Sequence, residues 1–201
     1  MSFSRQLRQI TILLVLSVAL ASCTVIGGGK ELTTYDLSAA SDLSDINGRS
    51  NAQILVQVPT ALKSLDSEMI VVRPNSSEIT YFGDAQWSDS LPRVLQDKLI
   101  QTFENSNRIR SVVKPGDGVS VDYKLATSIR AFELIDDDQT VAKVSLSIKL
   151  INDRTGRVRA SRQFQAVVPA NIQSTAKAVH ALDVALNSVL HDILAWVVKT
   201  I

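Results

Sequence analysis

The sequence predicts an α/β fold in which a mixed, largely antiparallel sheet packs with two long helices. Three successive segments, 121–135, 141–151 and 157–168, alternate apolar and polar residues, as strands with one solvated face do. Two others, 88–105 and 174–201, place apolar residues at helical spacing. The chain has 201 residues, of which 45% are hydrophobic and 20% charged, so one globular domain with its own core is expected.

The ordered domain is expected to begin after a tether. The serine- and aspartate-rich stretch 38–51 has the composition of a flexible linker, although 33–37 could pair as a short strand. The predicted divisions are a signal peptide (1–22), a lipidated cysteine with its tether (23–51) and a globular domain (52–201).

Short strands are predicted in the first half of this domain. Residues 53–58 alternate, with Ile54, Val56 and Val58 on one face, and a proline ends the run. Residues 69–73 and 78–82 flank the turn-rich Pro-Asn-Ser-Ser tetrad, which favours a hairpin. A further short strand should cover 109–114.

The two predicted helices have clear apolar faces. The first begins near Ser88, Asp89 or Ser90 and tolerates Pro92 in its first turn, where the missing N–H has no intrahelical partner. Its apolar face consists of Leu91, Val94, Leu95, Leu99 and Phe103. The second follows the three long strands, whose short connections indicate an antiparallel meander, and covers the sheet.

The first 22 residues have the layout of a secretory signal peptide. Arg5 and Arg8 precede an apolar run over 10–20, which is shorter than the roughly 20 residues of a membrane-spanning helix. The tetrapeptide Leu20-Ala21-Ser22-Cys23 then resembles the lipobox of bacterial lipoproteins, whose cysteine is acylated. A buried structural cysteine is the weaker alternative, because the only cysteine of the chain falls at this position.

The resemblance to lipoproteins also bears on location. Cys23 would hold the domain at the periplasmic face of a membrane. The next residue is Thr24 instead of the aspartate that retains lipoproteins in the inner membrane of enteric-type bacteria, which favours the outer membrane and leaves the inner membrane as the alternative.

Few residues suggest chemistry. The net charge of +1 without a dense basic stripe argues against nucleic-acid binding. His180 and His191 lie about 16 Å apart along one helix, too far to share a metal ion. The three aspartates 136–138 fit a solvated turn better than a calcium loop. We expect no catalytic residue, no metal and no cofactor.

Two aromatic residues are candidates for contact with a partner. Trp87 and Tyr81 could form an aromatic patch of the kind that anchors interfaces. An equally good interpretation is that Trp87 packs the start of the first helix against the core.

The segment 69–105 resembles the ABC-type transport auxiliary lipoprotein family, whose members include proteins similar to paraquat-inducible protein C. The resemblance rests on Met-Ile-Val-Val-Arg at 69–73, Glu-Ile-Thr-Tyr-Phe at 78–82, Trp87 and the helix that begins Leu-Pro-Arg-Val-Leu. It implies a fold similar to the TolB N-terminal or anticodon-binding domain.

The family resemblance implies a non-enzymatic role. The partners that the resemblance implies are a periplasmic Mce-domain protein, an ABC permease and an ATPase, which together move phospholipid or another hydrophobic molecule. A homo-oligomer is also compatible with the resemblance. One alternative is an assembly partner of an outer-membrane β-barrel. Another is a lipoprotein hydrolase, whose candidate residues would be Ser174, His180 and Asp183.

Overall fold

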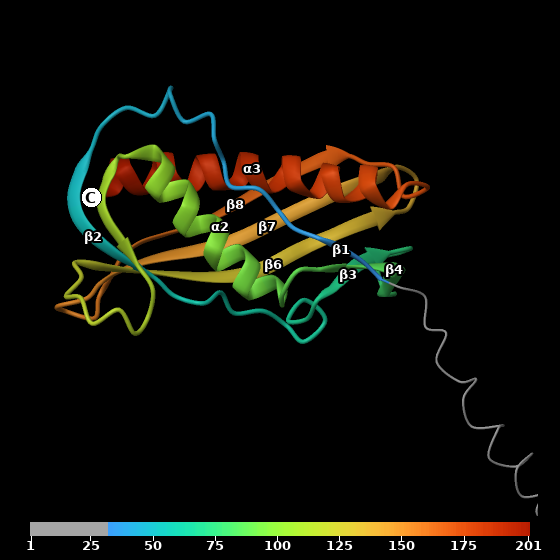
Figure 1. The fold of residues 1–201 in the computed structure, drawn as a ribbon, viewed down its shortest axis with the longest axis horizontal. Coiled ribbons are helices and arrows are strands. Elements are labelled where there is room, and N and C mark those ends of the chain that lie inside the picture. The colour runs from blue at the N-terminus through green and yellow to red at the C-terminus, as the bar shows by residue number, and fades with distance from the viewer. Residues whose placement is uncertain (1–31) are drawn as a thin grey trace, which may run out of the picture. The chain divides into compact units, whose positions relative to one another are not determined.

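Eight strands and two helices follow one another in residues 32–201, the part of the chain that the computed structural model describes (Figure 1). The elements are β1 (Thr33–Tyr35), β2 (Ser50–Val56), β3 (Met69–Arg73), β4 (Thr80–Trp87), α2 (Leu91–Ser106), β5 (Ile109–Val113), β6 (Tyr123–Asp136), β7 (Thr140–Asn152), β8 (Val158–Pro169) and α3 (Thr175–Thr200). The predicted signal peptide and lipobox lie outside the described residues.

Strand β6 is the centre of the sheet. Along one edge it pairs antiparallel with β7, which pairs antiparallel with β8, so the predicted meander is confirmed. Along the other edge, β2 pairs with residues 123–125 and β3 with residues 133–135, both parallel to β6. Strand β5 extends the first of these arms, and β4 and β1 extend the second. The predicted α/β fold, with a mixed sheet and two helices, is confirmed.

A β-bulge changes which residues of β6 face the core. The pairing with β7 shifts register between Ile129 and Ala131. Before the bulge Leu125 and Ile129 are buried in the core, and after it Phe132 and Leu134 are buried there. One extra residue is enough to exchange the two faces of a strand, because side chains alternate with period two.

The two helices cover one face of the sheet (Figure 1). Helix α3 lies across β7 and β8, and α2 lies beside β5. All five residues of the predicted apolar face of α2 are buried. In the described part of the chain, α3 is long and apolar enough to cross a membrane by length and composition. Most of its apolar side chains are buried in the core, however, as in the core helix of a globular domain.

Residues 36–49, which we name the strap, correct the prediction of a flexible tether up to residue 51. The strap runs over α2 and α3 (Figure 1) and buries four apolar side chains at every third position. These are Leu37, Ala40, Leu43 and Ile46. At its end Gly48 has φ +96°, and a Cβ there would lie 3.2 Å from Val198 Cγ1. The strap is therefore part of the packed domain, because this burial offsets the cost of ordering it.

Three smaller differences concern strand ends and faces. Strand β2 ends at Val56, so Val58 is exposed and does not share the buried face of Ile54 and Val56. The predicted strand 78–82 is the longer β4. Strand β8 forms an edge of the sheet, which leaves Val158 at its start exposed.

Trp87 is a core residue, which corrects its prediction as a partner contact. Its side chain is only 1% exposed, and its ring packs edge-on against Phe132 at 5.7 Å between centroids. Its backbone N–H donates to the Glu68 carbonyl at 2.7 Å. The alternative interpretation, in which Trp87 packs the start of α2 against the core, agrees with this position.

Replacing this ring should test the assignment directly. We expect Trp87→Ala to lower the free energy of unfolding by about 3–5 kcal/mol, because it leaves a large cavity beside Phe132. Urea unfolding measures the change. Tyr81→Ala, at an exposed position, is the control and should change stability by about 0.5 kcal/mol or less. A Trp87→Ala protein as stable as the control would contradict the core assignment.

Candidate functional site

The β3–β4 hairpin contains a hollow that arises from its irregular register. Met69 pairs with Gln86 and Val71 with Tyr81, so two steps along β3 match five along β4. Residues 82–85 of β4 therefore lie opposite the single residue Ile70 of β3, so β4 bulges at this point. A pocket of about 640 Å³, which we name the hairpin pocket, opens at this bulge.

The hairpin pocket is an apolar surface beside the start of the described chain. Its lining includes Leu32, Met69 and Tyr81, which are 45%, 52% and 40% exposed. Glu68 and Gln86 add polar groups to its lining. Large exposed apolar side chains that share one hollow with polar neighbours are typical of a protein or lipid contact site. Tyr81 therefore remains a candidate contact residue, and Met69 and Leu32, which the sequence reasoning missed, join it.

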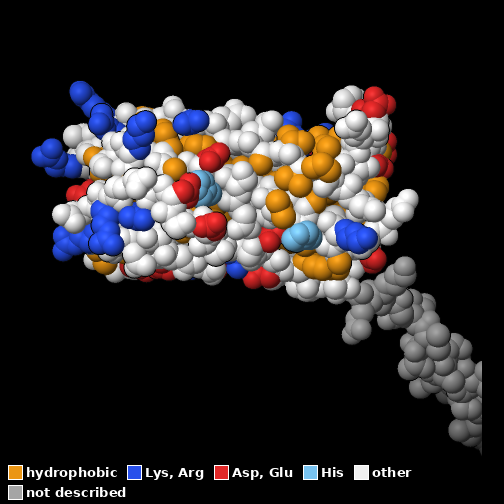
Figure 2. Space-filling model, turned by 90° about the horizontal axis from the view of Figure 1, so that it is seen from above, with side chains coloured by type: hydrophobic (Ala, Val, Ile, Leu, Met, Phe, Trp, Pro, Cys, Tyr) orange, Lys and Arg blue, Asp and Glu red, His pale blue; other side chains and the backbone are white. Residues whose placement is uncertain are grey.

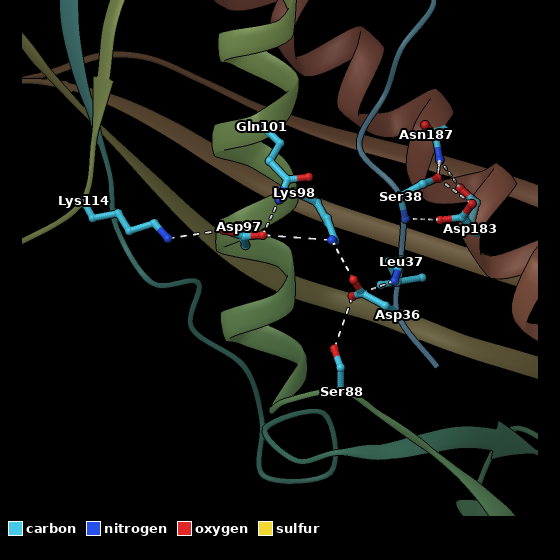
Figure 3. Close-up of polar contacts among 10 residues, drawn as sticks. All are labelled: Asp36, Leu37, Ser38, Ser88, Asp97, Lys98, Gln101, Lys114, Asp183 and Asn187. Atoms are coloured by element: carbon cyan, nitrogen blue, oxygen red, sulfur yellow. Dashed lines mark hydrogen bonds and ion pairs between the residues drawn. The ribbon is translucent and has the colours of Figure 1, made fainter. Parts of the chain in front are cut away.

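A polar network fixes the strap, and with it β1 and one side of the hairpin pocket (Figure 3). The Lys98 ammonium, largely buried on α2, donates to Asp36 Oδ2 at 2.9 Å. Asp36 also accepts hydrogen bonds from its neighbour Leu37 and from Ser88. Partial burial works against ionisation of Asp36, but the hydrogen bonds from Lys98 and Leu37 hold its pKa below the ordinary value.

The strap is also fastened to α3. Asp183 accepts hydrogen bonds from the backbone N–H and the hydroxyl of Ser38, at 2.7 and 2.6 Å, and Asn187 donates to the same hydroxyl (Figure 3). Farther along, His191 Nε2 lies 2.9 Å from Asp45 Oδ1. This hydrogen bond raises the pKa of His191 and lowers that of Asp45. The strap is therefore bound to both helices by charged groups.

The residues considered for catalysis and metal binding are not assembled into a site. Within residues 32–201 no group of three His, Cys, Asp or Glu side chains is placed to hold a metal ion. Asp183, a hydrolase candidate, holds the strap through Ser38. Asp136 lies in the turn that was compared with a calcium loop, and it accepts a hydrogen bond from Thr140 across the hairpin. These carboxylates have structural partners.

The comparison with protein families identifies the chain's relatives. The model of the ABC-type transport auxiliary lipoprotein component matches residues 35–194. The chain belongs to this family. The match begins at Tyr35 in β1, so the strap is part of the family domain, in agreement with its packing.

One curated relative and two solved structures are similar to this chain. The protein bll6063 of Bradyrhizobium diazoefficiens is 29% identical over 177 residues, which cover 87% of this chain and 48% of the relative, so the chain spans about half of that curated relative. The crystal structure of XCC0632 from Xanthomonas campestris is 29% identical, with a TM-score of 0.77 and coverage of 84% and 96%. CT253 of Chlamydia trachomatis, 8% identical with a TM-score of 0.51 and coverage of 75% and 98%, shares the fold alone.

Removing the Asp36 carboxylate should loosen the strap. We expect Asp36→Asn to lower the free energy of unfolding by about 1–3 kcal/mol, because the buried Lys98 ammonium loses its nearest anion. Hydrogen exchange of residues 36–43 should show the same loss locally. The double variant Asp36→Asn/Lys98→Met, which removes both charges, is the matched control and should recover part of the stability. Equal losses in both variants would contradict a role for the ion pair.

The contact between His191 and Asp45 should make the strap sensitive to pH. The raised pKa of His191 stabilises the folded chain fully below the ordinary value of 6.5, and this contribution is lost as pH rises through the raised value. The lowered pKa of Asp45 stabilises the folded chain above its ordinary value of 3.8, and this contribution is lost as pH falls through the lowered value. Between these limits we expect the slowest hydrogen exchange of residues 44–47, after correction for intrinsic rates. His191→Gln should abolish the dependence, and a variant that keeps it would contradict this assignment.

Proposed function

We propose that the protein is a non-enzymatic auxiliary lipoprotein of an Mce-type ABC transport system that moves phospholipid or another hydrophobic molecule. The match of residues 35–194 to the ABC-type transport auxiliary family carries the proposal. The carboxylates of Asp36, Asp136 and Asp183 form hydrogen bonds within the fold. This structural use of the carboxylates is compatible with a binding role.

The proposed anchor is an acylated Cys23 in the outer membrane, with the domain at its periplasmic face. Leu32 lies nine positions after Cys23 in the sequence. An extended chain spans at most about 3.6 Å per residue, so the hairpin pocket would lie within about 32 Å of the anchored cysteine. The anchor would therefore hold the apolar surface of the hairpin close to the membrane, and the inner membrane remains the alternative location.

The proposed contact with the transporter is the hairpin pocket. Its exposed Met69 and Tyr81 can enter a complementary apolar surface of the periplasmic Mce-domain protein, which works with the permease and the ATPase. Methionine and tyrosine suit such a contact because they bury a large area at a moderate cost in conformational entropy.

Substitutions at the hairpin pocket test the proposal. The lipidated protein is cross-linked in cells and purified from membranes in mild detergent. We expect an Mce-domain protein to co-purify, and Met69→Asp/Tyr81→Asp to reduce its recovery at least about tenfold, because charged side chains would be buried in the contact. Val184→Asp, at an exposed apolar position on α3, is the control.

The identity of the captured protein separates the candidate functions. Recovery of an Mce-domain protein with the control but not with the double variant supports both the transport role and the hairpin contact. Equal recovery with both variants would contradict the hairpin contact alone. Recovery of only a β-barrel would contradict the transport role and favour the assembly-partner alternative.

A further inference from the structure

The second surface of interest lies at the end of the domain where the chain terminates. Figure 2 shows lysine and arginine side chains gathered at its left end, which is the end of the C-terminus in Figure 1. We define the basic end by six exposed residues from four segments of the chain. They are Arg49, Lys149, Arg154, Arg157, Arg159 and Lys199.

The fold brings these segments together. Ser50, Asn152, Arg154 and the C-terminal Ile201 line one hollow of about 600 Å³, so the start of β2, the β7–β8 turn and the end of α3 converge. The turn has a defined shape, since Asn152 Oδ1 accepts from the backbone N–H and hydroxyl of Thr155, both at 2.9 Å. Gly156 completes it with φ +67°. The arginines around the turn are therefore displayed by a fixed backbone.

Among the described residues, the carboxylates at this end form no ion pair with these arginines. Asp153 pairs with Lys124 at 2.6 Å, and Asp122 accepts a hydrogen bond from the Gln53 backbone. In the described part of the chain no carboxylate lies within 4.0 Å of Arg154, Arg157 or Arg159. The net charge of +1 thus conceals a strongly positive end.

Exposed apolar side chains accompany the charges. Val119, in the loop that precedes β6, is 45% exposed, and Val158, between Arg157 and Arg159, is 53% exposed. Binding to an acidic protein surface would require only the cations. Apolar side chains flanked by lysine and arginine are instead typical of binding at the interface of an anionic bilayer, where the charges contact headgroups and the apolar tips enter between them.

We propose that the basic end binds the surface of an anionic phospholipid bilayer. This surface lies at the opposite end of β6 from the hairpin pocket, because β2 pairs with the start of β6 and β3 with its end. The proposed lipid anchor and the basic end would then give the protein two membrane contacts at separate places. The inference does not depend on the transporter role.

Vesicle binding tests the inference on the mature chain from residue 23, with Cys23→Ser to remove lipidation. Cooperative thermal unfolding first shows that this protein is folded. Sedimentation is compared for vesicles of phosphatidylcholine alone and vesicles that also contain phosphatidylglycerol. We expect binding to the anionic vesicles only, and a steep loss as salt rises from about 0.05 M to about 0.5 M.

Charge reversal then locates the surface. Arg154→Glu/Arg157→Glu/Arg159→Glu should weaken partitioning at least about a hundredfold, since each basic residue near an anionic surface contributes about fivefold. The matched control, Lys63→Glu/Arg93→Glu/Lys177→Glu, reverses the same number of exposed charges elsewhere and should change binding little. Both variants are first shown to unfold at the same temperature as the parent protein.

The possible outcomes are decisive. Binding to anionic vesicles that the first triple variant loses and the control keeps supports the inference. Equal binding to both vesicle types, or equal loss in both variants, would overturn it. So would a parent protein that ignores the vesicles but binds an acidic protein through the same arginines, because the surface would then be a protein-docking site.

Discussion

The fold depends on the length of β6 and on its pairing with two different strands along one edge. Its fourteen residues span about 45 Å, enough for β2 to pair at the start and β3 at the end while β7 occupies the whole opposite edge. Each arm of the sheet is short and would be marginal alone. Because both arms are parallel to β6 and hydrogen-bonded to it, the position of the hairpin pocket is fixed by the same strand that begins at the basic end.

The strap turns this sheet into a closed domain. Without it, α2 and α3 would expose the apolar surfaces that Leu37, Ala40 and Leu43 cover. Its polar groups bind complementary groups on the helices, with Lys98 opposite Asp36 and Asp183 opposite Ser38. Burial supplies most of the stabilisation and the charged pairs supply specificity, since exposed ion pairs alone contribute little. The position of the strap on the two helices is therefore well defined.

The predictability of each part follows from how local its cause is. The α2 face and the β7 alternation were visible because one element contains the whole pattern. The strap was missed because its apolar residues recur every third position, a period of neither helix nor strand, within a serine- and aspartate-rich composition typical of linkers. Trp87 was ambiguous because Phe132, its partner, lies 45 positions later in the sequence. The hairpin pocket arises from a register shift, and the basic end from four distant segments, so neither has a local sequence signal.

The separation of the two surfaces limits how they can influence each other. A contact at the hairpin pocket and one at the basic end would lie at opposite ends of β6, whose pairing with β7 is interrupted by the bulge between Ile129 and Ala131. Sites this far apart that share no residues usually act independently in free energy. If one surface is bound, it holds the domain in place and so raises the effective concentration of the partner of the other surface. This effect needs no change of shape. A weak surface at the basic end would then be sufficient, because the proposed anchor at the other end would already hold the domain beside a membrane.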